Sequence, residues 1–194
     1  MIDGKSVLAI IPAREGSRRV PLKNLTLFRG KPLIQHAIDH AKGSQYIDRI
    51  VISSDSPAIL KYAQIPISGI PRPDYLASDR ATSEALIAHA LYAEFNKPDY
   101  FVLLQPTSPL RTPADIDECI SRAHRFSGRC ISWDQYGKRN GAVFVCRSNL
   151  FLANLQLEDR QTGADYFTMP QERSLDIDYD QDFAYSGDLK NASK

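Results

Sequence analysis

Short apolar runs alternate along the chain with segments whose apolar residues recur at helical spacing. Residues 6–13, 47–55 and 100–105 each contain a short apolar run, which is typical of strands buried on both faces. Residues 31–44 and 82–95 instead carry their apolar side chains on one helical face. This alternation predicts an α/β fold of the three-layer, Rossmann-like kind, with a mainly parallel sheet.

Local start signals extend this pattern. Thr112 followed by Pro113 predicts a helix over 112–126, with acidic residues in its first turn. Ser56-Pro57 predicts a helix over 56–63 in the same way. The remaining expectations are strands at 129–133 and 141–147, a mostly irregular stretch at 65–79, and a disordered tail at 187–194.

Composition narrows the possible functions. The chain has 194 residues, enough for one domain with a substantial core, and its net charge of +1 speaks against a general nucleic-acid or membrane binder. No apolar run is long enough to span a bilayer. Cys119, Cys130 and Cys146 are too sparse for a disulfide framework, which predicts free thiols and a cytoplasmic location.

The first chemical feature is a basic loop, residues 13–24, directly after the first apolar run. It contains Gly16 and four cationic side chains, those of Arg14, Arg18, Arg19 and Lys23. Ligands of open α/β sheets sit at the carboxyl ends of the strands, and arginine and lysine there can hold phosphate oxygens. A solvated charged loop is the alternative interpretation. The Gly-Lys-Ser/Thr ending of a P-loop is absent.

The second feature is an acidic segment, residues 174–183, near the other end of the chain. If its start is extended, the carboxylates of Asp176 and Asp178 point to the same side. Mg²⁺ is commonly held by one or two carboxylates together with water and substrate phosphates. An acidic turn that caps a short final helix is the alternative. Together, the basic loop and the acidic segment favour a binding site for a polyphosphate and its divalent cation.

A third group of polar residues follows the strand predicted at 100–105. Gln105, Thr107, Ser108 and Arg111 lie in the stretch LLQPTSPLR, where they suit substrate contact or a turn built on two prolines. Arg72, taken alone, is typical of a surface position.

Five stretches in order make the chain resemble the acylneuraminate cytidylyltransferases, the CMP-sialic acid synthetases. They are IPAREGSRRVPLKN, RPDYLASDRATS, LLQPTSPLR, NGAVFV and SLDIDYDQDF, spread from about Val7 to about Phe183. The resemblance implies a nucleotidyltransferase fold, with CTP and an acidic, sialic-acid-like sugar as substrates and Mg²⁺ as cofactor. The enzymes that activate Kdo (3-deoxy-octulosonate) share this general plan.

The resemblance also implies roles for individual residues. The implied nucleotide-binding residues are Ala13, Arg14, Ser17, Arg18, Lys23, Asn24, Arg72 and Ser83. Among them Arg14, Ser17 and Lys23 would contact the triphosphate, and Asn24, Arg72 and Ser83 would frame the cytosine and ribose. Gln105 would meet the sugar, Asp176 and Asp178 would bind Mg²⁺, and the catalytic residues would be Arg14, Lys23 and Asp178.

The chain departs from the family pattern at several positions. Arg18 stands where a lysine is usual, and Lys138 and Arg139 stand at the arginine and proline of the usual RPNGA. Residues 131–145 run from one predicted strand straight into the next, without the arm that mediates dimerisation in typical members. The oligomeric state therefore stays open. Two alternatives also remain, a CTP-binding protein that has lost synthesis and a transferase for another sugar acid such as Kdo.

Overall fold

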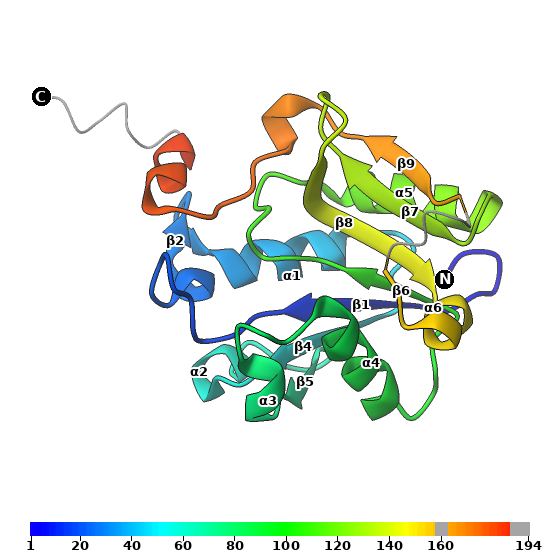
Figure 1. The fold of residues 1–194 in the computed structure, drawn as a ribbon, viewed down its shortest axis with the longest axis horizontal. Helices are drawn as coiled ribbons and strands as arrows, with labels where there is room; N and C mark the ends of the chain where they lie inside the picture. Colours follow the sequence, from blue (N-terminus) through cyan, green and yellow to red (C-terminus); the bar gives the residue numbers. More distant parts are fainter. Residues whose placement is uncertain (158–162, 187–194) are drawn as a thin grey trace, which may run out of the picture.

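A seven-stranded sheet forms the centre of the molecule, with the strand order β5-β4-β1-β6-β8-β7-β9 (Figure 1). The computed structural model describes residues 1–157 and 163–186, and the tail predicted at 187–194 lies outside them. Strands β5, β4, β1 and β6 are parallel, β8 is antiparallel to both neighbours, and β9 is parallel to β7. The predicted mainly parallel sheet is therefore confirmed. The strands are β1 (Val7–Pro12), β4 (Arg49–Ser54), β5 (Ser68–Pro71), β6 (Tyr100–Leu103), β7 (Arg129–Trp133), β8 (Arg139–Arg147) and β9 (Asp165–Thr168).

Helices cover both faces of this sheet. Alternate β1 side chains enter two separate cores, because successive residues of a strand point to opposite faces. Ala9 and Ile11 pack with α1 (Leu33–Gly43) and α5 (Pro113–Arg125). Leu8 and Ile10 pack with α4 (Ser83–Ala93) and α6 (Ser148–Asn154). The layers are thus helix, sheet and helix, as predicted.

The start signals in the sequence work as expected in the long helices. Thr112 caps α5, where its hydroxyl accepts a hydrogen bond from Asp115 N while the Asp115 carboxylate accepts one from Thr112 N. Thr82 caps α4 through a bond from Ala85 N. Each cap pairs backbone N–H groups that a helix start would leave unsatisfied.

The direction in which the chain adds strands to the sheet reverses between β1 and β6. From β1 the chain passes to β4 on one side, and it returns to β6 on the other side of β1. The carboxyl ends of β1, β4 and β6 therefore open at one edge, on either side of a switch point. The basic loop leaves β1 there, and on the left of Figure 1 the blue chain after β1 lies beside the red segment that ends the described residues.

Several expectations need correction. The irregular stretch predicted at 65–79 contains β5 and the short helix α3 (Asp74–Ala77). In β5, an edge strand of four residues, only Ile70 is buried, so no apolar run marks it. The helix predicted at 56–63 is shorter, α2 (Pro57–Leu60). Sequence patterns also missed α6 and β9.

The direct connection between β7 and β8 is a tight turn. Asp134 Oδ1 accepts hydrogen bonds from Tyr136 N and Lys138 N, each at 2.9 Å. Gly137 supplies the positive φ, 74°, that this turn needs. No inserted arm interrupts residues 133–139. The three cysteines are buried and free, and no helix among the described residues has the length and apolarity needed to cross a bilayer.

Candidate functional site at the carboxyl edge of the sheet

The basic loop and the acidic segment meet at the carboxyl edge of the sheet. Lys23 Nζ donates to Ile177 O at 2.8 Å and to Asp178 Oδ1 at 3.2 Å. Arg19 Nη1 lies 3.0 Å from the other Asp178 oxygen, and its guanidinium sits 4.8 Å above the ring of Tyr179. Residues separated by about 155 positions therefore share one ionic cluster.

Backbone contacts set the shape of the basic loop. Lys23 begins the short 3₁₀ helix η1 (Lys23–Leu25), and Leu22 before it is left-handed, with φ 53°. The buried Asn24 side chain donates to Arg14 O at 2.9 Å, which ties the two ends of the loop together. Ser17 Oγ accepts from Val20 N at 3.5 Å. At the root of the loop, the fully buried Ala13 donates its N–H to Ser53 O on β4.

Two arginines of the basic loop share one carboxylate. Arg14 Nη1 lies 2.7 Å from Asp79 Oδ1, and Arg18 Nε pairs with Asp79 Oδ2. The hydrogen bond from Arg14 holds the pKa of Asp79 below its usual range. All three groups are accessible to solvent, so the pair can exchange for a ligand at little cost in stability. This arrangement presents guanidinium groups where a phosphate could replace the carboxylate.

Arg72, expected at the surface, is instead buried beneath the basic loop. It donates from Nη2 to Ser53 O at 2.7 Å and from Nε to Ser53 Oγ at 3.3 Å. Burial lowers the pKa of Arg72 to about 10, and nearby Arg14 adds to this shift while Asp55 opposes it. Arg72 therefore braces the ends of β4 and β5, next to Arg14 rather than remote from it.

Asp176 and Asp178 are placed by backbone bonds on either side of them. Ile177 is buried and donates its N–H to Thr107 O at 2.8 Å. Asp182 Oδ2 accepts from Asp178 N and Tyr179 N, both at 2.7 Å. Although part of Asp176 is exposed, desolvation by the surrounding protein raises the pKa of its carboxyl, and the charge of Asp178 adds to this.

The carboxylates of Asp176 and Asp178 are the candidate ligands for a divalent ion. No group of three or more His, Cys, Asp or Glu side chains suited to a metal exists within residues 1–157 and 163–186. A site made of protein atoms alone is therefore not built there. Asp178 lies beside the cationic side chains of Arg19 and Lys23, and Asp176 offers a second carboxylate two residues before it. Mg²⁺ binds in this way, through one or two carboxylates and phosphate oxygens.

The loop after β6 adjoins this cluster through Thr107, whose backbone binds the acidic segment. Its Gln105 side chain lies against Gly141, where an added Cβ would come within 2.9 Å of Gln105 Oε1. Gly141 has φ +69° and follows Asn140, a buried amide that accepts from Ser132 Oγ and Ala142 N. A glycine is thus required here both for the left-handed backbone at this point of β8 and for the space that Gln105 occupies.

Arg111 does not point toward the carboxyl edge of the sheet, although its position after a strand suggested substrate contact. It is 1% exposed and donates from Nη1 to Gln105 O at 2.9 Å and to Ala142 O at 2.6 Å. Burial lowers the pKa of Arg111 to about 9, against the opposing charge of Asp115. Arg111 therefore fixes the backbone that carries Gln105 to β8.

Ser83 is the one expected residue that stands apart from the cluster. It is the first residue of α4, and it lines a cavity of about 570 Å³ together with Arg139 and Gln156. Among the described residues no hydrogen bond or ion pair links Ser83 to the basic loop. Sequence patterns singled out Thr107 for substrate contact and not for its backbone bond to the acidic segment. They missed Asn140 and the contact of Arg19 with Asp178, although NGA marks the stretch of Asn140.

A sequence profile of the family described as "Cytidylyltransferase" matches residues 8–185. A CMP-N,N'-diacetyllegionaminic acid synthase of Legionella pneumophila is 38% identical over 131 residues, 64% of this chain and 56% of its own length. An N-acylneuraminate cytidylyltransferase of Streptococcus agalactiae is 31% identical over 92% of this chain and 52% of its own length. The chain thus spans about half the length of these curated relatives.

Solved structures share the fold at low sequence identity. A CMP:2-keto-3-deoxy-manno-octonic acid synthetase complexed with CTP superposes with a TM-score of 0.76 at 15% identity, covering 95% of this chain and 98% of the other. Rv0371C of Mycobacterium tuberculosis, in complex with manganese, superposes with a TM-score of 0.67 at 15% identity, covering 96% and 100%.

Proposed function

Because the chain belongs to the cytidylyltransferase family, we propose that it transfers CMP from CTP to an acidic sugar of the nonulosonic, sialic-acid-like class. The observation that carries this proposal is the meeting of Lys23 and Arg19 with Asp178 at the switch point of the sheet. A triphosphate needs cations and a carboxylate-bound divalent ion at one place. The named relatives that use CTP or make CMP-sugars support the choice of nucleotide.

In the proposed reaction, the anomeric hydroxyl of the sugar attacks the α-phosphorus of CTP in line with the departing pyrophosphate. A bond forms between the sugar oxygen and phosphorus, the bond from phosphorus to the bridging oxygen of pyrophosphate breaks, and the hydroxyl loses its proton. Catalysis of this kind depends mainly on positioning and charge stabilisation. Arg14, Ser17, Arg18 and Lys23 would hold the triphosphate, and Ala13, Asn24, Arg72 and Ser83 would surround the nucleoside.

Asp176 and Asp178 would hold the divalent cation, which we propose to be Mg²⁺. When bound, it would neutralise charge on the phosphate oxygens. The manganese complex of a structural neighbour supports a divalent ion without selecting magnesium. In the structure Lys23 and Arg19 occupy the Asp178 oxygens. They would turn toward the phosphates when nucleotide arrives; the pair with the accessible Arg19 is easily exchanged, and the phosphates would replace the carboxylate as the anion beside Lys23.

Gln105 would meet the sugar, placed by Arg111 and by the space that Gly141 leaves. The legionaminate and N-acylneuraminate relatives support a nonulosonic acid, and the structural neighbour that acts on 2-keto-3-deoxy-manno-octonic acid supports Kdo as the second candidate. The tight turn between β7 and β8 means that any sugar contact from an inserted arm would have to be replaced. A cytoplasmic location, based on the sparse cysteines, stays a prediction.

The test is a pyrophosphate-release assay in which CTP, UTP, ATP or GTP is paired with N-acetylneuraminate, N,N'-diacetyllegionaminate or Kdo, with and without Mg²⁺. We expect release only with CTP and a nonulosonic acid, and only with the divalent ion. Pyrophosphate release with Kdo alone would show that Kdo, and not a nonulosonic acid, is the acceptor, and would leave the proposed class of reaction unchanged. No release with any pair would remove the proposed reaction.

A CTP-binding protein without synthesis is the second candidate function, and the short β7–β8 turn favours it. Calorimetric titration of CTP with Mg²⁺ separates the two. Tight CTP binding with no pyrophosphate release across the panel would establish the second candidate. Turnover with any sugar acid would exclude it.

A further inference from the structure

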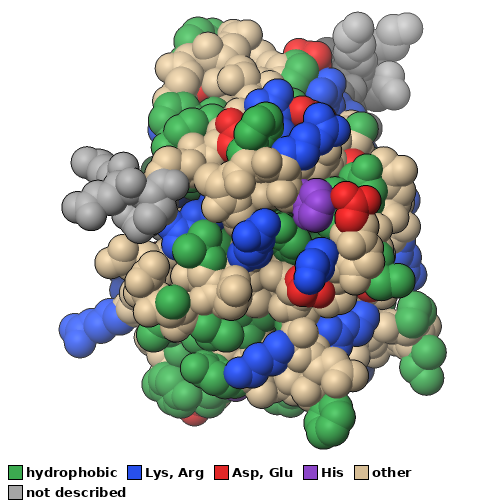
Figure 2. Space-filling model, turned by 90° about the vertical axis from the view of Figure 1, so that its right-hand side faces the viewer, with side chains coloured by type: hydrophobic (Ala, Val, Ile, Leu, Met, Phe, Trp, Pro, Cys, Tyr) green, Lys and Arg blue, Asp and Glu red, His purple; other side chains and the backbone are tan. Residues whose placement is uncertain are grey.

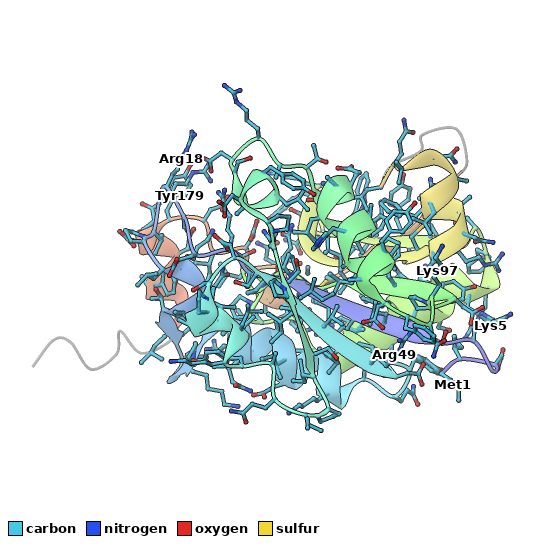
Figure 3. All side chains as sticks on the ribbon, turned by 90° about the horizontal axis from the view of Figure 1, so that it is seen from below. Met1, Lys5, Arg18, Arg49, Lys97 and Tyr179 are labelled. Carbon is cyan, nitrogen blue, oxygen red and sulfur yellow. The ribbon has the colours of Figure 1, made fainter. Side chains whose placement is uncertain are left out.

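The edge of the sheet opposite the basic loop contains a second cavity, which we call the distal pocket. It has a volume of about 720 Å³ and lies where β6 begins, at Tyr100, and where β8 ends, at Arg147. Figure 2 faces this end of the molecule, where lysine and arginine side chains gather around a histidine. Figure 3 shows Lys5 and Lys97 at this end and Arg18 and Tyr179 at the other.

The charges of the distal pocket are unbalanced in favour of cations. Lys5, Lys97 and Arg147 line it, and Asp99 is the carboxylate among its lining residues. Asp99 is already engaged, because its Oδ2 accepts from Ser6 N at 2.9 Å and Oδ1 lies 3.5 Å from Lys5 Nζ. Within residues 1–157 and 163–186, no carboxylate pairs with Lys97 or Arg147. These two cations can therefore meet an anion without first breaking an ion pair.

Arg147 is held in a fixed orientation beside the pocket. Its Nε donates to the hydroxyl of Tyr100 at 2.9 Å, and its guanidinium lies 5.7 Å over the Tyr100 ring. Tyr100 is 2% exposed and also contacts His124 Nδ1 at 3.4 Å, while His124 Nε2 lies 3.0 Å from Asp3. A guanidinium anchored through Nε keeps its outer Nη groups for a ligand.

A buried hydroxyl provides an independent sign of a missing ligand. Ser148 lines the distal pocket, is 4% exposed, and its Oγ has no hydrogen-bond partner among the described residues. An unpaired buried hydroxyl costs free energy, and such groups usually have a partner. Ser148 Oγ has almost no accessible surface in its present rotamer, so a ligand oxygen would satisfy it once the side chain turns about χ1 into the distal pocket.

We propose that the distal pocket binds a small organic anion whose phosphate or carboxylate group contacts Arg147, Lys97 and Ser148 Oγ. The apolar body of this ligand would lie against Pro98, Leu152 and Ala153, which also line the cavity. A few convergent polar groups beside apolar walls are typical of small-molecule sites. The proposal does not depend on the cytidylyltransferase reaction, since the basic loop is at the other edge of the sheet.

Calorimetric titration of the full chain with phenyl phosphate, benzoate and inorganic phosphate tests the distal pocket. The same titrations on Lys23→Ala remove a principal cation of the basic loop and leave the distal pocket intact. We expect phenyl phosphate or benzoate to bind wild type and Lys23→Ala equally. Tighter phenyl phosphate binding would assign a phosphorylated ligand, and tighter benzoate binding a carboxylate. Binding of neither probe would overturn the proposal.

Substitutions then locate the site. Arg147→Gln and Lys97→Gln should each weaken the bound probe by about tenfold, whereas Lys61→Gln, an exposed lysine elsewhere, should leave it unchanged. Lys97 lies 5.5 Å over the Tyr92 ring and forms no ion pair with the part of the chain that the structure describes, so this variant should keep the fold even if Arg147→Gln does not. Equal binding by wild type and Lys97→Gln, or equal weakening by Lys61→Gln, would overturn the proposal.

Ser148→Ala separates a ligand role from a structural role. If Ser148 Oγ awaits a ligand, the variant should bind the probe about threefold more weakly without a lower thermal midpoint, because no protein hydrogen bond is lost. A lower midpoint with unchanged probe binding would show that the hydroxyl serves the fold, and would overturn its assignment to the distal pocket.

Discussion

The two parts of the proposed active site use their charged side chains in opposite ways. In the nucleotide half, the basic loop with the acidic segment, Lys23 and Asp178 form an ion pair in which the carboxylate is 46% exposed. In the acceptor half, residues 105–111 with Gly141, Arg111 is buried and donates to two backbone carbonyls. The first set is available for a ligand, and the second holds the frame that positions Gln105.

This difference predicts different consequences of mutation. Exposed ion pairs contribute on the order of 0–1 kcal/mol to stability, so variants of the nucleotide half should change ligand binding and turnover with little loss of stability. A buried polar group that loses its partner costs about 1–3 kcal/mol, and packing is tight around it. Variants of the acceptor half should therefore alter stability and acceptor use together.

The largest effect is expected for Asp178→Asn. The amide removes one of the two carboxylates that would hold the divalent ion, so pyrophosphate release should fall at least about 100-fold. The midpoint of thermal unfolding should change little, because the Asp178 carboxylate and its partner Arg19 are accessible to solvent, and the less exposed Lys23 keeps its hydrogen bond to Ile177 O. Asp180→Asn, an exposed aspartate in the same segment, is the matched control. Full turnover by Asp178→Asn would remove the metal assignment.

Lys23→Ala should have the next largest effect, on CTP affinity. We expect a loss of about 30-fold for CTP and little change for cytidine, because the lysine would contact the phosphates and not the nucleoside. Calorimetric titration of both ligands measures this. Lys31→Ala, which breaks an exposed pair with Asp39, should bind CTP normally. If the binding of CTP and of cytidine were weakened equally, Lys23 would not contact the phosphates.

The comparison between the halves also explains what could be predicted from the sequence. The meeting of Lys23 and Asp178 was predictable, because a basic loop after the first strand of an α/β sheet falls at a ligand-binding edge that an acidic segment can complete. The burial of Arg111 and Arg72 was not predictable. Both follow strands in proline-containing stretches, and the sequence does not say whether such an arginine turns outward or donates to carbonyls beneath the sheet edge.

Gly141→Ala tests the acceptor half directly. Its Cβ would push Gln105 Oε1 from 2.9 Å, so kcat/KM for the sugar acid should fall about tenfold while CTP affinity stays unchanged. Its positive φ, +69°, adds roughly 1 kcal/mol of strain. Gly137→Ala is the matched control, because it has φ +74° but meets only the Trp133 ring at 3.8 Å. Equal loss of kcat/KM in both variants would assign the effect to strain rather than to Gln105.

The smallest effect concerns His40 on α1, whose pKa is lowered by burial and by the charge of Arg111 in the acceptor half. Desolvation lowers its pKa from 6.5 to about 3, with further contributions from Arg111 and His36. Below pH 6.5 the unfolded chain binds a proton at this histidine while the folded chain does not, so stability falls as pH decreases from 6.5 toward 3. This contribution is absent above pH 7.

His40→Gln should remove that part of the acid sensitivity. Relative to wild type, the free energy of unfolding of the variant should lose about 0.7 kcal/mol less as pH falls from 7 to 6, and about 1.2 kcal/mol less as pH falls from 6 to 5. Urea unfolding at pH 7, 6 and 5 measures the two slopes. The same substitution at His89, on α4 away from Arg111, gives the comparison variant. Parallel slopes for wild type and His40→Gln would mean that His40 takes up its proton in the folded protein as readily as in the unfolded chain, and that burial does not lower its pKa.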